Sequence, residues 1–324
     1  MKKKFALILT VIFAFGIFVS CSSKETKETK EVTVVIPDGL TAIATAKLMK
    51  EKPEISKGYN IEYSIEKTPE NIVSEVLKGE TDIAIVPSNV AATQYNKEGK
   101  YVVAGTVGWG AFYLVSTGEE NSIDQLKGKE IFNIGKGLTP DLITRTVLKD
   151  KGYNLDSDFN FSYVNGVTEL TPTILSGKTS YAVIPEPALT QVLSKKTNAK
   201  IIMDFNEEWK KANNSEYGFP QSTIIIKKDL VDNDSKFVES FLKQIESSCN
   251  FALENNSNLP SYCEELGVSV NKDIVSNSIE KANIKYVPIK NCYKEYDAYF
   301  NKLKELDPKT IGGKVPDEGV YMEK

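Results

Sequence analysis

The stretch LKGETDIAIVPS (Leu77–Ser88) and its later echo LSGKTSYAVIPE (Leu175–Glu186) decide the expected fold. Leu, Gly, Thr, Ala and Pro recur at the same five of twelve positions, at an offset of 98 residues. Each copy has the pattern of a helix end, a glycine cap, a short buried strand and a proline-led turn into another helix. Any two βα units share some of this pattern, but five identities favour a duplicated lobe. Two such lobes facing each other predict a cleft between them.

Strands and helices alternate around both copies. Strands are expected at 31–36, 59–65, 82–86 and 101–107, and again at 130–134, 161–164, 181–184 and 222–226. Short connections between alternating strands and helices favour mainly parallel sheets covered by helices. The sequence therefore predicts an α/β protein of two lobes joined by two crossover segments, with lobe I at 32–116 and 224–324 and lobe II at 120–221.

Composition excludes several function classes. The 324 residues, enough for about two domains, contain no histidine, one arginine (Arg145) and 39 lysines, and the formal net charge is −4. Without histidine there is no His-based metal site or His general base. An acidic chain with one arginine is a poor nucleic-acid binder, and no phosphate-binding glycine motif supports a nucleotide. We expect no cofactor, no metal and no nucleic-acid partner.

The N-terminus has the pattern of an export and anchoring signal. Three lysines precede an uncharged, mostly apolar run at 5–20, too short for a permanent membrane span but typical of a signal peptide at 1–20. The run ends in FVSC, which resembles a lipobox and predicts lipidation of Cys21. The polar segment that follows predicts a flexible tether at 21–31. A plain secretory signal with an incidental cysteine is the alternative. The expected location is the outer face of a bacterial cytoplasmic membrane.

Three further cysteines, Cys249, Cys263 and Cys292, leave their pairing open. Cys249 and Cys263 are close enough in sequence to bridge neighbouring helices, and a disulfide is permitted outside the cytoplasm. Unpaired small apolar side chains are the simpler alternative. No C-x-x-C motif is present, so the sequence predicts neither a zinc ribbon nor a thioredoxin-type site.

Several segments together resemble one known family. They are GETDIAIVPSN at 79–89, Trp109-Gly110 with YLV at 113–115, LKGK at 126–129, the strand and PEP turn at 177–187, and PKTIGGKVPD at 308–317. In order and spacing, behind a lipobox, they resemble the solute-binding lipoproteins of ABC transporters that bind nitrate, sulfonates, taurine and thiamine precursors. The resemblance implies a type II periplasmic-binding-protein fold of two lobes closing on a ligand. We expect a monomer that docks on an ABC permease subunit.

Ligands of open α/β sheets bind beyond the carboxyl ends of the strands. Helix starts there offer free N–H groups and partial positive charge, and hydroxyls, amides and aromatics add contacts. Capping is the alternative role for the polar candidates, and packing for the aromatic ones. We expect ligand contacts from Asp38, Gly39, Thr41, Ser88, Asn89, Trp109, Gly110, Phe112, Gly137, Thr139, Asn165 and Glu186.

The leading hypothesis is that the protein captures a small organic molecule for an ABC importer. The ligand is expected to be polar or anionic, and a pyrimidine-like compound and a sulfonate are the alternatives. Trp109 is expected to face this ligand, because a thin turn between glycines leaves few neighbours to bury it. A ligand-sensing lipoprotein is a second hypothesis. An enzyme on the same fold is a third, disfavoured by the export signal and the absence of histidine.

Overall fold

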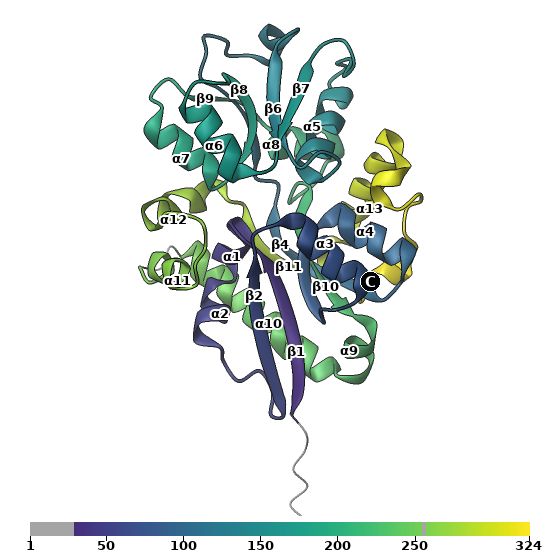
Figure 1. The fold of residues 1–324 in the computed structure, drawn as a ribbon. Coiled ribbons are helices and arrows are strands. Elements are labelled where there is room, and N and C mark those ends of the chain that lie inside the picture. Colours follow the sequence, from purple (N-terminus) through teal and green to yellow (C-terminus); the bar gives the residue numbers. More distant parts are fainter. Residues whose placement is uncertain (1–28, 255–256) are drawn as a thin grey trace, which may run out of the picture.

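The computed structural model describes residues 29–254 and 257–324, which form two α/β lobes (Figure 1). We define lobe I as 30–109 with 220–324, and lobe II as 110–219. The predicted α/β architecture is confirmed: each lobe is built on its own sheet, one of six strands and one of five. The predicted Cys21 and most of its tether lie outside the described residues. Lys30 and Glu31, expected at the end of the tether, instead pair with β2.

The sheet of lobe I has the order β11-β4-β10-β3-β1-β2. Strand β1 is parallel to β2 and β3, whereas β10 runs antiparallel to β3 and β4, and β11 antiparallel to β4. The strands are β1 (Lys30–Pro37), β2 (Tyr59–Glu66), β3 (Ile83–Pro87), β4 (Tyr101–Trp109), β10 (Pro220–Lys227) and β11 (Ile284–Pro288). The helices are α1 (Leu40–Ala44), α2 (Ala46–Glu51), α3 (Pro69–Lys78), α4 (Ser88–Lys97), α9 (Lys228–Asn233), α10 (Ser235–Leu253), α11 (Leu259–Glu265), α12 (Lys272–Ser278) and α13 (Ile289–Leu306), with 3-10 turns η2 (Ile279–Lys281), η3 (Pro308–Ile311) and η4 (Glu318–Val320).

The sheet of lobe II has the order β7-β6-β8-β5-β9, with β5 antiparallel to β8 and β9. Its strands are β5 (Phe112–Ser116), β6 (Glu130–Ile134), β7 (Asn160–Val164), β8 (Tyr181–Pro185) and β9 (Lys200–Asp204). Its helical elements are η1 (Ile123–Leu126), α5 (Thr139–Asp150), α6 (Val167–Leu175), α7 (Ala188–Lys195) and α8 (Phe205–Asn213). The expected boundaries therefore shift. Residues 112–116, assigned to lobe I, pair with β8 in lobe II, and 220–221, assigned to lobe II, begin β10 of lobe I.

The two copies of the repeated segment have the same local geometry. Gly79 and Gly177 end their helices in the left-handed region, with φ of 76° and 75°, which glycine adopts without strain. The hydroxyls of Thr81 and Thr179 then donate to the first strand of each copy, at Ile83 O (3.0 Å) and Tyr181 O (3.1 Å). Two of the five residues shared by the copies, the glycine and the threonine, thus build this turn.

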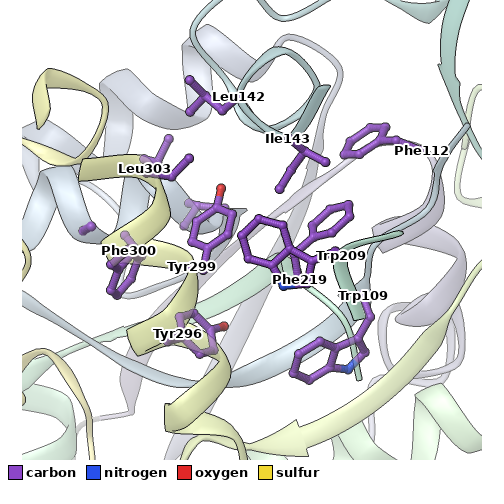
Figure 2. Close-up of a cluster of buried hydrophobic side chains, with 14 of the residues drawn as sticks. Trp109, Phe112, Leu142, Ile143, Trp209, Phe219, Tyr296, Tyr299, Phe300 and Leu303 are labelled. Atoms are coloured by element: carbon purple, nitrogen blue, oxygen red, sulfur yellow. The ribbon is translucent and has the colours of Figure 1, made fainter. Parts of the chain in front are cut away.

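Alternation along the central strands separates two apolar layers. In β1, Val34 belongs to the cluster under α1, α2 and α10, whereas its neighbour Val35 belongs to the cluster under α3, α4 and α13. The second cluster continues without interruption into lobe II. Figure 2 shows Tyr299 of α13 beside Trp209 of α8; Leu142 of α5 belongs to the same cluster, and the ring centroids of Trp209 and Tyr299 are 6.0 Å apart. Helix α13 therefore carries the core of lobe I across to lobe II.

The chain crosses between the lobes twice at one crowded point. Gly110 on the outward crossing donates its N–H to the carbonyl of Phe219 on the return crossing, at 3.1 Å. A Cβ at Gly110 would lie 2.3 Å from Asn206 Oδ1 and 2.4 Å from the Phe219 ring. Only glycine fits this position without displacing both side chains.

We expect Gly110→Ala to destabilise the protein by about 1–3 kcal/mol, the usual cost of overpacking. The matched control is Gly166→Ala, because a Cβ there meets nothing within 4 Å and its φ of 169° is extended backbone. Urea unfolding of both variants measures the difference. Equal stabilities for the two variants would show that the crossing is not tightly packed.

Candidate functional site

The strand ends of lobe II meet at the edge that faces lobe I. The register pairs Phe112 with Pro185, Tyr113 with Asp204 and Ile134 with Val164, so the start of β5 and the ends of β6, β7, β8 and β9 share one edge. Helices α5 to α8 begin directly after these ends. Lobe I presents the starts of α1 and α4 toward lobe II (Figure 1). We call this contact zone the seam.

One side of the seam joins α4 to α5. The Asn89 amide donates from Nδ2 to the carbonyl of Thr310 at 3.3 Å, and its Oδ1 accepts from the Thr139 hydroxyl of the other lobe at 3.4 Å. The side chains of Asn89 and Thr139 are both buried. The η3 turn thus orients Asn89 so that its oxygen faces lobe II.

Two buried donors on this side lack an acceptor. The Tyr299 hydroxyl and the Trp209 indole N–H are buried, and neither donates a hydrogen bond to an acceptor within the described residues. Burial raises the pKa of Tyr299, while the nearby Thr139 hydroxyl and Asn89 backbone lower it. A buried polar group without a partner costs about 1–3 kcal/mol, so both groups are suited to an incoming acceptor.

The other side of the seam centres on Glu186. Only 2% of this residue is exposed, and its carboxylate accepts from the Thr190 backbone N–H at 3.1 Å and the Thr190 hydroxyl at 2.9 Å. Nearby, the Tyr113 hydroxyl of lobe II donates to the carbonyl of Lys281 of lobe I at 2.8 Å. Burial raises the pKa of Glu186 to about 7, although Thr190 and the Lys281 charge lower it. Glu186 is therefore a buried acid at the seam.

A hydroxyl network lies beneath the start of α4. Ser88 donates to the carbonyl of Pro220 at 2.7 Å and lies 2.6 Å from the Thr223 hydroxyl. Tyr296 of α13 joins Thr223 at 2.8 Å. At the start of α1, Thr41 Oγ1 lies 3.2 Å from the Oγ of Ser222, which precedes Thr223 in β10. These hydroxyls tie both helix starts to β10, the strand that returns from lobe II.

Two predicted site residues, Asp38 and Asn165, make hydrogen bonds within the protein. Asp38 accepts from the N–H of Gly39 at 2.8 Å and of Ser269 at 3.0 Å. Asn165 donates its backbone and side-chain N–H groups to Glu169, at 3.0 and 3.1 Å. These bonds order the loops before α1 and α6, and neither side chain caps the helix that follows it.

The loop before α5 is ordered by its own carboxylate. Asp141 accepts from the Gly137 N–H at 2.9 Å, from Arg145 Nε at 2.8 Å and from the Tyr163 hydroxyl at 2.6 Å. The single guanidinium is therefore used within lobe II. The Gly137 N–H, expected to be available to an anion, is already bonded.

The aromatic candidates pack in the core. Trp109 is 2% exposed, its indole N–H donates to the Lys285 carbonyl at 3.1 Å, and its ring lies 4.8 Å from that of Tyr217. Phe112 stacks on Phe219 with centroids 6.1 Å apart. The expectation that a thin turn leaves Trp109 few neighbours is wrong, because β11 and the returning crossover cover it.

Sequence reasoning missed Tyr299, Trp209 and Tyr113. Tyr299 lies on a helix whose buried residues, Ile289, Cys292, Tyr296, Tyr299 and Leu303, follow helical spacing, a pattern that indicates core packing. Nothing in that pattern distinguishes a core tyrosine from one whose hydroxyl reaches a seam. Only the approach of α5 and α8 from the other lobe gives it this position.

Two further features of the described residues bear on function. Cys249, Cys263 and Cys292 are buried and free. Within 29–254 and 257–324 there is no group of three or more potential metal-ligating His, Cys, Asp or Glu side chains. Over the same residues, none of the helices has the length and apolarity to cross a bilayer.

The sequence matches the model of one protein family. The family model described as menaquinone biosynthesis matches residues 42–302. The chain belongs to the menaquinone biosynthesis family. No protein of curated function matches the sequence at a significant level.

Solved structures share the fold of this family member. An ABC transporter structure from Parabacteroides distasonis has 27% identity and a TM-score of 0.78, covering 92% of this chain and 100% of that chain. The periplasmic aliphatic sulphonate-binding protein SsuA from Escherichia coli has 11% identity and a TM-score of 0.67, covering 89% and 92%. The periplasmic nitrate-binding protein NrtA from Synechocystis PCC 6803 has 13% identity and a TM-score of 0.64, covering 88% and 84%. The predicted likeness to solute-binding proteins is confirmed at the level of the fold.

We expect Glu186→Gln to stabilise the protein at pH 8 and to have little effect near pH 4.5. The raised pKa means that folding favours the protonated acid, so stability is lost as pH rises from 4.5 through about 7. At about 1.4 kcal/mol per unit of pKa, the gain at pH 8 is about 2–3 kcal/mol.

Urea unfolding at pH 5 and pH 8 measures this effect, with Glu169→Gln as the control because Glu169 is exposed at the start of α6. A Glu186→Gln variant that follows wild type at both pH values would contradict the burial of a charged acid.

Proposed function

We propose that this protein is an extracytoplasmic solute-binding lipoprotein that captures a small organic ligand between its lobes and delivers it to an ABC importer. The observation that supports it most directly is the pair of buried, acceptorless donors, Tyr299 hydroxyl and Trp209 N–H, at a seam where the strand ends of two lobes meet. Ligands of α/β folds bind at such strand ends. The printed descriptions of the similar structures name ABC-type and periplasmic binding proteins.

Recognition would rest on neutral groups. Asn89 and Thr139 span the seam, and Thr41 and Ser222 add hydroxyls from lobe I. The guanidinium of Arg145 is paired with Asp141. We therefore propose a ligand held by hydroxyls, amides and aromatic N–H groups, with its polar atoms matched on both lobes. Closure of the lobes around it would bury it from water.

The family description favours one alternative, an enzyme of menaquinone biosynthesis. The absence of histidine removes the commonest general base, and the buried acids that such an enzyme could use include Glu186 and Asp141. A sensing lipoprotein needs the same closing cleft. Turnover of a retained compound would favour the enzyme, and a neighbouring permease gene would favour transport.

Ligand capture is tested with protein purified without denaturation. Native mass spectrometry is expected to detect one small organic molecule per chain, retained from the cell or taken up from a cell extract. Tyr299→Phe should weaken its retention about tenfold, because the acceptor atom of the ligand loses the hydroxyl that donates to it. Tyr63→Phe is the matched control, since Tyr63 also has a buried hydroxyl without a partner but lies on the edge strand β2.

Both phenylalanine variants should stabilise the ligand-free protein slightly, because each removes an unsatisfied buried hydroxyl. A protein that retains nothing from the extract would contradict the proposed function. Equal retention by the two variants would remove Tyr299 from the site.

Membrane attachment is tested at Cys21. The FVSC motif and the polar tether support a lipid anchor on this residue, so Cys21→Ala is expected to move the protein from the membrane fraction to the soluble fraction or to block its processing. Cys263→Ala serves as the control, because that thiol is buried in lobe I. Normal cleavage with unchanged membrane retention in Cys21→Ala would exclude the anchor.

A further inference from the structure

On the α7 side of the seam, two elements of lobe I lie against lobe II. Helix α12 packs against α7, and Figure 1 shows it directly below that helix. The turn η2, which follows α12 in the chain, bonds to the other lobe, because the Tyr113 hydroxyl of β5 donates to the carbonyl of Lys281 at 2.8 Å. Separation of the lobes must break these contacts. A group buried beside them therefore changes its surroundings when the lobes open.

Glu186 is a titratable group buried at this contact. It stands between β8 and α7 of lobe II and is 2% exposed. Its backbone N–H donates to the carbonyl of Ala111 at 3.1 Å, and its side chain accepts from the backbone N–H and the hydroxyl of Thr190 at 3.1 and 2.9 Å. A charged carboxylate offers about four acceptor sites. The two bonds from Thr190 leave it only half satisfied.

Little positive charge compensates this acid. Lys281 of η2 is the cation whose charge acts on Glu186, but none of the ion pairs between described residues includes Glu186. A buried carboxylate without an ion pair is costly. The other titratable groups on the elements packed around Glu186 and Tyr113 are Asp204 and Glu207 at the start of α8, the exposed Lys272 and Asp273 of α12, and the exposed Glu280 of η2.

The surroundings of Glu186 favour the neutral acid while the lobes are closed. Burial raises the pKa of Glu186 to about 7, although Thr190 and the Lys281 charge lower it. When the lobes open, water reaches the carboxyl group and its pKa returns toward the ordinary value of 4.5. The closed form therefore holds the proton more tightly than the open form. A rise in pH from 4.5 through about 7 shifts the equilibrium toward the open form.

We propose that Glu186 is a proton-controlled latch on the closure of the two lobes. While Glu186 is protonated, α7 of lobe II rests on α12 and η2 of lobe I without burying a charge. When the proton leaves to water, the closed form has to bury a carboxylate, and the lobes separate on the α7 side. The apolar cluster around α13 holds the other side. The latch acts on the movement of the lobes and does not depend on which molecule they bind.

Spin labels on the two facing helices test the latch. Ser194→Cys on α7 and Asn277→Cys on α12 replace exposed side chains, and Cys21→Ala provides the background because Cys249, Cys263 and Cys292 are buried. Pulsed electron paramagnetic resonance without added ligand is expected to show one short distance at pH 5 and an additional longer distance at pH 8. The ratio of open to closed form should rise at least tenfold, since each unit of pKa difference between the two forms allows a tenfold change.

Three substitutions in the labelled protein assign the effect to Glu186. Glu186→Gln should keep the short distance at both pH values, because its amide stays neutral. Glu169→Gln, whose carboxylate is exposed at the start of α6, should behave as the parent protein does. Lys281→Met should keep the short distance at pH 5 and enlarge the open fraction at pH 8, because the buried carboxylate then loses the charge that partly compensates it.

Three results would overturn the latch and leave ligand capture intact. They are a distance that does not change between pH 5 and pH 8, a Glu186→Gln variant that still opens with rising pH, and a Lys281→Met variant that opens no further than the parent at pH 8. Circular dichroism at both pH values separates opening from unfolding. Loss of the helical signal at pH 8 would show that the change is unfolding, which would also overturn the latch.

Discussion

The crossing of the two interlobe segments is the constraint on which the rest of the structure depends. Gly110 and Phe219 are bonded backbone to backbone, and Asn206 fills the space that a side chain at Gly110 or Gly218 would need. Because both crossings are locked at one point, the strands on either side must end there. The helix starts that follow those strands then converge on the same seam, which is why polar side chains distant in sequence meet.

The two sides of the seam differ in chemistry. On the α13 side, Trp209, Tyr299 and Leu142 form one apolar cluster shared by both lobes. On the α7 side, the contact rests on the Tyr113 bond to Lys281 and on the buried Glu186. Separating the lobes on the α13 side exposes aromatic surface to water, which costs about 25 cal/mol for each Å². On the α7 side, water can replace the broken hydrogen bonds, so separation there has little net cost. Opening is therefore easiest on the α7 side, with α13 near the axis of motion.

Sequence patterns predicted the structure of the repeated segment, Leu77–Ser88 and Leu175–Glu186, because each part of it has a local cause. Gly79 and Gly177 require a left-handed conformation, and the buried strands after them need alternating or continuous apolar residues. Strands β5, β9 and β11 were not predicted. Strand β11, for example, follows a run of helices and pairs only with β4, which lies far away in the sequence. The same holds for the seam: strand ends predicted the positions of Asn89, Thr139 and Glu186, whose role in ligand binding stays a prediction, but the placement of Tyr299 and the burial of Trp109 follow from tertiary packing alone.

Duplication explains how such a site acquires polarity. A repeated βα unit produces two helix starts in equivalent places, which by themselves would offer identical N–H groups and attract the same anion from both sides. Ser88 leaves one of these helix starts neutral. Its hydroxyl donates to the Pro220 carbonyl and lies within hydrogen-bond distance of the Thr223 hydroxyl. Glu186 converts the other into an acid held by its own helix. A single divergent position thus places a neutral hydroxyl on one lobe and a buried carboxylate at the equivalent position of the other.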